Sequence, residues 1–254
     1  FRCDMAMLVP LDFWREARIT IDRTRPLFWL AECEDIAYHS VFDISYTWKF
    51  LHSMEDFRKN PVSPDGLYDV LQFYNDRFPP QAMRAYFTSN HDENSHSGSE
   101  YERLGEAALP FAVFCCTWNG VPLVYSGQEL PNRKRLKFFE KDQIDWKMPC
   151  ALHDFYKSLL TLRKRNPALR SGDPSVITIK LPNNANQPVM SFLRRRASNE
   201  VLVILNLSAN AVSFVLSTEE VKGSFSNIFS TEKQNINSAT VFNLKPWEYR
   251  VYEK

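Results

Sequence analysis

The sequence predicts an α/β protein in two parts, with parallel strands and helices alternating over residues 1–170 and an antiparallel β-sandwich over residues 171–254. Short apolar runs alternate with helical periodicities in the first part, and such an alternation indicates a parallel sheet. Near Ser171-Gly172-Asp173-Pro174 the pattern changes to β-rich runs separated by turn residues, which is typical of a small sandwich. Three acidic residues each follow a strand-like run of the first part.

Four segments of the first part have the periodicity of helices. In the first of them, Pro10 suits the first turn, and Phe13, Ala17 and Ile21 are spaced to share one helix face. Pro26 ends the same segment. The expected helices cover residues 11–24, 66–78, 101–118 and 152–165.

Strand-like runs lie between these helices and throughout the second part. Those of the first part cover residues 27–31, 41–46, 84–89 and 121–125. The run at 27–31 is continuously apolar, as a strand buried on both faces should be. Those of the second part cover residues 176–181, 189–194, 201–207, 212–216, 240–244 and 249–252.

The three acids at the ends of strand-like runs are Asp4, Glu32 and Asp92. In a parallel barrel, strands carry such residues to the end where the loops build active sites. Cleavage of a glycosidic bond requires at least two carboxylates. A third carboxylate, beside His91, can stabilise a cation-like transition state. The sequence therefore points to chemistry on sugars.

Several motifs in a fixed order extend this reading over the whole chain. They are Arg2-x-Asp4, Ala31-Glu32, Phe87-x-x-Asn90-His91-Asp92, the segment Gly120-Val121-Pro122-Leu123-Val124-Tyr125-Ser126-Gly127-Gln128-Glu129, and the ending Leu244-Lys245-Pro246-Trp247-Glu248-Tyr249-Arg250-Val251-Tyr252. In this order they resemble the α-amylase family of retaining α-glycoside hydrolases. The segment after Gly120 is similar to the last barrel strand of that family, and the ending is similar to the close of its C-terminal β-domain.

The resemblance implies three catalytic residues and three substrate-binding residues. The catalytic residues would be Asp4 as nucleophile, Glu32 as general acid and Asp92 as transition-state stabiliser. The substrate-binding residues would be Arg2, Asn90 and His91. On a strand, Arg2 and Asp4 point to the same side, so the guanidinium would favour the ionised carboxylate.

Glu34 is the alternative general acid, because it lies only two residues after Glu32. The family motif places a small residue before the acid, as Ala31 stands before Glu32, and this favours Glu32. Glu34 and Asp35 are then expected to be exposed acids of a loop or of a helix start.

The resemblance implies a partial (β/α)8 TIM barrel, because the nucleophile motif of the family follows its fourth strand and here begins at Arg2. Residues 1–170 would be the C-terminal half of the barrel and 171–254 the C-terminal β-domain. We expect no cofactor in this segment, while calcium is possible in the full-length enzyme. An open half-barrel exposes strand edges, so we expect self-association that covers the edge.

The expected function is a retaining α-glycoside hydrolase that acts on α-1,4-glucans such as starch and maltooligosaccharides. A catalytically incomplete fragment, a glucan-binding module and an α-glucan transferase are the alternatives. Many α-amylases carry Lys-His three and four residues after the nucleophile, where this chain has Met7 and Leu8. The substrate preference therefore stays open.

Composition limits the other function classes. With 31 basic and 30 acidic residues the net charge is +1, so no nucleic-acid partner is expected. The basic runs Arg133-Lys134-Arg135 and Arg194-Arg195-Arg196 are interpreted as solvated loop residues. Five cysteines argue against a full disulfide framework, and no apolar run is long enough to predict a membrane span. The compartment stays open, with a periplasmic, cell-surface or secreted location favoured.

Overall fold

The computed structural model describes all 254 residues and contains a parallel sheet followed by antiparallel sheets. The parallel sheet has five strands in the order β1-β2-β3-β4-β5. The strands are β1 (Arg2–Cys3), β2 (Leu30–Ala31), β3 (Ile44–Tyr46), β4 (Met83–Tyr86) and β5 (Val121–Pro122). Neighbours along the chain are therefore neighbours in the sheet, and helical segments connect them, as parallel strands require. This arrangement confirms the predicted partial barrel.

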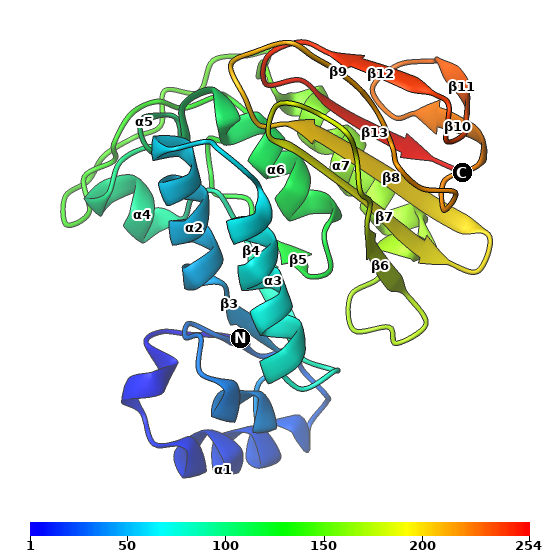
Figure 1. Cartoon of the computed structure of the whole chain (residues 1–254). Helices are drawn as coiled ribbons and strands as arrows, with labels where there is room; N and C mark the ends of the chain where they lie inside the picture. The colour runs from blue at the N-terminus through cyan, green and yellow to red at the C-terminus, as the bar shows by residue number, and fades with distance from the viewer.

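The helices of this part cover the sheet and its ends (Figure 1). They are α1 (Leu11–Asp22), α2 (Trp48–Lys59), α3 (Asp65–Arg77), α4 (His91–His96), α5 (Glu100–Leu104), α6 (Ala108–Thr117) and α7 (His153–Arg165). Short 3-10 turns cover Ala6–Leu8, Ile36–Ser40, Gly105–Ala107 and Pro167–Leu169. The predicted helices at 11–24, 66–78 and 152–165 are confirmed to within a few residues.

One predicted helix, at residues 101–118, is wrong as a single element, because the structure divides it into α5 and α6. Gly105 has φ 57°, a left-handed conformation that an α-helix cannot contain. Pro110 stands in the first turn of α6, where its missing N–H costs nothing. Helix α2 was not predicted. Its buried residues Phe50, Leu51, Met54 and Phe57 nevertheless have helical spacing.

The second part contains a six-stranded sheet in the order β11-β10-β13-β8-β7-β6 and a two-stranded sheet of β12 and β9. Its strands are β6 (Ile177–Lys180), β7 (Val189–Arg196), β8 (Asn199–Asn206), β9 (Val212–Val215), β10 (Gly223–Asn227), β11 (Lys233–Ile236), β12 (Val241–Leu244) and β13 (Tyr249–Glu253). All pairs are antiparallel, which confirms the predicted β-domain. Strands β10 and β11 were not predicted, because Gly-Ser-Phe-Ser-Asn and Lys-Gln-Asn-Ile are mostly polar.

The apolar core is continuous between the two parts. Side chains of β7 and β8 belong to the same buried cluster as those of α2, α3 and α6. The ring of Phe192 lies 4.7 Å from that of Trp118 and 6.0 Å from that of Phe114. A second cluster fills the space between the two antiparallel sheets. The domain boundary at residue 170 stays a prediction.

The basic run at residues 194–196 is not in a loop, and the prediction of solvated side chains is wrong. Arg194 lies in β7 with no exposed surface and donates to the carbonyl of Ala168 at 3.2 Å. Arg195 pairs with Glu200 at 2.6 Å, and Arg196 pairs with Asp173 at 2.8 Å.

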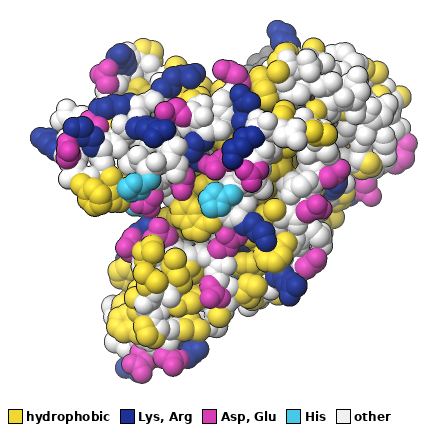
Figure 2. Space-filling view, turned by 60° about the vertical axis from the view of Figure 1, so that its left-hand side comes forward, with side chains coloured by type: hydrophobic (Ala, Val, Ile, Leu, Met, Phe, Trp, Pro, Cys, Tyr) yellow, Lys and Arg dark blue, Asp and Glu magenta, His cyan; other side chains and the backbone are white.

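Helix α1 packs differently from its predicted face. None of its residues is buried, and Phe13 and Ile21 of the expected apolar face are exposed. Trp14 makes the packing contacts, since its ring lies 5.4 Å from that of Phe42 and its Nε1 donates to the carbonyl of Ala6 at 2.9 Å. Figure 2 shows hydrophobic side chains gathered over the lower part of the molecule, which contains α1.

The five cysteines form no disulfide, and Cys115 and Cys116 are buried in α6. Helices of sufficient length and hydropathy to cross a membrane are absent.

Candidate active site

The carboxyl ends of β1 to β4 lie at one edge of the parallel sheet, and the three predicted catalytic residues follow three of these ends. Register pairs Cys3 with Ala31 and Ala31 with Ser45, so Asp4 and Glu32 leave adjacent strands at the same level. Asp92 follows β4 in the first turn of α4. Loops at this edge of parallel strands are where α/β sites form.

Arg2 joins two of these carboxylates. Its Nη1 donates to Oδ1 of Asp4, and its Nη2 lies 3.0 Å from Oε1 of Glu32. The planar guanidinium presents several donors in a fixed fork, so one side chain can hold two carboxylates close together. The expected Arg2–Asp4 pair is therefore present, and it extends to Glu32.

The two carboxylates differ in exposure. The side chain of Asp4 is 77% exposed and that of Glu32 only 7%. An exposed carboxylate can approach a sugar carbon, whereas a buried one is held in place. The geometry thus distinguishes one accessible acid from one enclosed acid.

The second oxygen of Glu32 is held by the backbone. Oε2 accepts the N–H of Met5 at 2.7 Å, and Met5 has φ 39° and ψ 46°, a left-handed conformation that is unfavourable for a side chain of this size. Both oxygens of Glu32 thus accept donors, from Met5 and from Arg2. A general-acid step requires one of these contacts to be exchanged for the leaving oxygen.

Tyr46 is the last residue of β3, the strand next to β2. It is buried, with its ring 5.3 Å from that of Phe87. Burial raises the pKa of the Tyr46 hydroxyl, the adjacent Arg2 opposes that rise, and the charges of Glu32 and Asp92 add to it. The Tyr46 hydroxyl is therefore influenced by charges that follow β2 and β4 as well as by Arg2 of β1.

His91 and Asp92 form a pair at the start of α4. Nε2 of His91 lies 3.3 Å from Oδ2 of Asp92, and the side chains are 49% and 28% exposed. The ring of Phe138 lies nearly parallel to that of His91, with centroids 6.4 Å apart. Figure 2 shows two histidines beside the hollow between the lower part of the molecule and the rest.

Asn90 is buried and caps a helix, which differs from the exposed position expected of a residue that contacts a sugar directly. Its Oδ1 accepts the N–H of Glu93 at 2.7 Å, which caps α4. Its Nδ2 has no partner within the protein. A role of Asn90 in substrate binding stays a prediction, as do the roles of the other five site residues.

Glu34, the alternative acid, is not the exposed residue that we expected. Its Oε1 accepts the hydroxyl of Tyr74, and its Oε2 accepts the N–H of Lys49 at 2.8 Å in the first turn of α2. Burial raises the pKa of Glu34. Asp35 does cap a helical turn, through the N–H of Ala37 at 2.9 Å.

Met5 and Tyr46 join the predicted residues at the site. Strand periodicity could have placed Tyr46 beside the acids, but no sequence signal marks the left-handed backbone of Met5. The structure brings no three His, Cys, Asp or Glu side chains together in a way that could hold a metal ion.

Two curated relatives of this chain are named as α-amylases. No family model matches the sequence. Over its whole length the chain is 23% identical to a maltogenic α-amylase of Bacillus acidopullulyticus, of which it covers 44%. Over 82% of its length it is 29% identical to the α-amylase MalA of Haloarcula japonica, of which it covers 31%. The chain thus spans less than half the length of these curated relatives.

Solved structures share the fold over the entire chain. A noncanonic maltogenic α-amylase, AmyB of Thermotoga neapolitana, superposes with a TM-score of 0.84 at 24% identity, covering 100% of this chain and 60% of that one. The α-amylase GTA of Geobacillus thermoleovorans, solved with acarbose, has a TM-score of 0.82 at 15% identity, covering 99% and 59%.

Proposed function

We propose that this chain, a relative of the α-amylases in sequence and fold, carries the reacting carboxylates of a retaining α-glycoside hydrolase that acts on α-1,4-glucans. The observation that carries the proposal is the Arg2 guanidinium between Asp4 and Glu32. It holds an accessible and an enclosed carboxylate next to each other, as the double-displacement mechanism needs. In retaining enzymes the two carboxyl groups are about 5–5.5 Å apart.

In the proposed mechanism Asp4 attacks the anomeric carbon and forms a covalent glycosyl-enzyme. Protonated Glu32 donates its proton to the leaving oxygen, and its carboxylate then takes a proton from the water that releases the sugar. Asp92, paired with His91, would stabilise the positive charge that develops on the sugar ring. Arg2 orients the Asp4 carboxylate for this attack through their ion pair.

The substrate class is supported by the relatives, which include a structure of an α-amylase with acarbose and one of AmyP with maltose. The loop after Asp4 presents Met7 and Leu8, which are 43% and 71% exposed. These side chains cannot donate hydrogen bonds to a leaving-group sugar. Hydrolysis and transfer to another glucan both remain open, because they differ only in the acceptor.

The test is turnover of a 4-nitrophenyl α-maltooligosaccharide by the chain, by Asp4→Asn and by Glu32→Gln. Asp12→Asn is the matched control, because Asp12 is also an exposed aspartate paired with an arginine, Arg15. We expect both site variants to lose activity and the control to keep it. Equal activity of wild type and Asp4→Asn would contradict the proposed nucleophile.

A catalytically incomplete fragment or a glucan-binding module is the second candidate. It is favoured by the chain's coverage of only 31–44% of these curated relatives. Maltotriose binding by calorimetry separates the two candidates. Binding without turnover, together with turnover by a longer polypeptide that includes upstream residues, would identify a fragment.

We further propose that the chain self-associates through its N-terminal part. Strand β1 is at the edge of the parallel sheet, and exposed apolar side chains cluster in this part. They include Phe1, Leu8, Phe13 and Phe28, which are 60%, 71%, 56% and 50% exposed. Uncovered edges and apolar patches favour association. A stable monomer in light scattering at micromolar concentration would contradict this proposal.

A further inference from the structure

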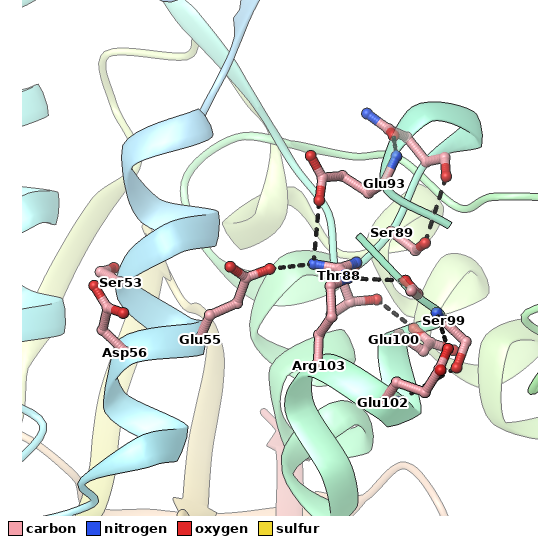
Figure 3. A network of polar contacts seen from close by, with 12 residues as sticks. Ser53, Glu55, Asp56, Thr88, Ser89, Glu93, Ser99, Glu100, Glu102 and Arg103 are labelled. Atoms are coloured by element: carbon pink, nitrogen blue, oxygen red, sulfur yellow. Dashed lines mark hydrogen bonds and ion pairs between the residues drawn. The ribbon is translucent and has the colours of Figure 1, made fainter. Parts of the chain in front are cut away.

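Arg103 of α5 has an enclosed guanidinium near the proposed site. Its side chain is 6% exposed. Nε donates to the carbonyl of Gly98 at 3.0 Å, and Nη2 donates to the carbonyl of Thr88 at 2.6 Å. Figure 3 shows the side chain at the centre of a polar network between α2 and the segment that follows β4.

The two carbonyls bracket the segment that carries His91 and Asp92. Thr88 lies two residues after β4, and Gly98 lies two residues before α5. One guanidinium therefore ties both ends of residues 88–98 together. The segment between these ends includes α4 and its cap.

Two carboxylates complete the contacts of the guanidinium. Nη1 donates to Oε1 of Glu55 on α2 and lies 3.7 Å from Oε2 of Glu93 on α4. A buried cation needs such partners, because desolvation without them costs several kcal/mol. Glu93 directly follows Asp92, so the second carboxylate attaches Arg103 to the middle of the segment.

Thr88 is held a second time by the same helix. Its Oγ1 donates to Oε2 of Glu100 at 2.6 Å and accepts Nε2 of Gln128 at 2.9 Å. Glu100 and Arg103 are three residues apart, so they lie on one face of α5. Gln128 also donates to Glu100, and this bond brings the loop after β5 into the network.

We infer that Arg103 is a positioning residue that fixes residues 88–98 and thereby the placement of His91 and Asp92. Its effect on catalysis rests on the proposed function, while its effect on the segment does not. Lysine cannot replace it, because an ammonium lacks the planar fork that reaches two carbonyls and a carboxylate at once.

The first test is hydrogen–deuterium exchange of the 254-residue chain without ligand. In Arg103→Lys we expect exchange of residues 88–98 to rise about tenfold, with α6 and β8 unchanged, because local opening follows the loss of local contacts. Arg135→Lys is the matched control, since Arg135 pairs with Glu102 of the same helix at 3.1 Å but is 51% exposed. Unchanged exchange of residues 88–98 in Arg103→Lys would overturn the inference.

The second test is steady-state kinetics on the 4-nitrophenyl substrate with whichever wild-type polypeptide turns over. We expect kcat of Arg103→Lys to fall about 100-fold with little change in KM, as misplacement of a reacting group by about 1 Å does. Altered exchange with unchanged kcat would show that Arg103 orders the segment without positioning the reacting groups, and would overturn the catalytic part.

Failure of the proposed function is distinguishable from failure of this inference. Absence of turnover in every wild-type form would refute the function, while the exchange measurement would still decide whether Arg103 fixes the segment. Should Arg103→Lys not fold, Glu55→Gln removes one charged partner and leaves the bonds to Thr88 and Gly98. We expect about threefold faster exchange of residues 88–98 in that variant, and no change in it would contradict the network.

Discussion

The guanidinium of Arg2 in β1 lies 3.0 Å from the carboxylate of Glu32, which is 30 positions later and directly follows the adjacent strand β2. The same guanidinium holds Asp4. A single cation therefore sets the spacing of the two carboxylates.

Replacing Arg2 should affect both carboxylates at once. For Arg2→Lys we expect kcat/KM on the 4-nitrophenyl substrate to fall about 100-fold, because an ammonium cannot hold two carboxylates in fixed orientation. Arg15→Lys, which changes an exposed Arg–Asp pair on α1, should stay near wild type. A decrease in kcat/KM no larger than that of Arg15→Lys would show that Arg2 does not position the two carboxylates.

Glu32→Gln should show a dependence on the leaving group. A general acid matters less when the leaving group is already acidic, so this variant should lose far more activity on maltooligosaccharides than on an α-maltosyl fluoride. Asp4→Asn should lose activity on both substrates. Parallel losses of Glu32→Gln on both substrates would contradict its role as the acid.

His39 should make the stability of the protein depend on pH. Burial, and then the charge of Arg84, lower the pKa of His39 from 6.5 to about 4. Its Nε2 is 2.7 Å from Oγ of Ser45, while Nδ1 is buried without a partner. Between pH 6.5 and 4 the unfolded chain binds a proton that the folded chain does not, so the free energy of unfolding falls as the pH drops.

The loss from this one residue should reach about 2–3 kcal/mol near pH 4. Urea unfolding of His39→Asn across this range should show a flatter pH profile than wild type. His52→Asn, which changes an exposed histidine, should keep the wild-type slope. Identical profiles for wild type and His39→Asn would contradict the assignment.

Two glycines provide a matched test of the packing around β4 and β5. A Cβ on Gly120 would lie 2.4 Å from the carbonyl of Arg84 and 2.5 Å from the ring of Tyr86. Gly120→Ala should therefore lower the free energy of unfolding by about 2 kcal/mol or more. Gly66, in α3, has nothing within 4 Å of such a Cβ.

Gly66→Ala should consequently be neutral or stabilising by up to about 1 kcal/mol, because alanine restricts the unfolded chain and favours the helix. Thermal unfolding of the two variants checks the contrast. A similar melting temperature for both would mean that the backbone near Gly120 can move to accept a side chain.

Local motifs at strand ends were sufficient to predict the parallel sheet and the position of the three acids. Asp4 and Glu32 follow strand-like runs, and strands that are parallel and adjacent bring such ends to the same edge. No local pattern could predict that Arg2 reaches Glu32, because that contact depends on the register between β1 and β2.

The burial of Arg194 could not be predicted for a related reason. In β7 the side chains of Met190 and Phe192 pack on one cluster, and those of Val189 and Leu193 pack on the other. Both faces of this strand are covered, so the alternation of buried and exposed positions that identifies a surface strand is absent. Only the tertiary structure places the carbonyl of Ala168 where it accepts a hydrogen bond from the Arg194 guanidinium.

Helix α6 is made well before the strands that cover it in the folded protein. Nine of its ten residues are buried, and its outer surface meets Phe192 of β7. On the ribosome this apolar helix emerges before β7 and β8 have been synthesised. Its apolar surface therefore stays exposed while roughly 80 more residues are made. At about 5–20 residues per second this lasts several seconds. The exposure of α6 ends when β7 and β8 have been made and can pack against it.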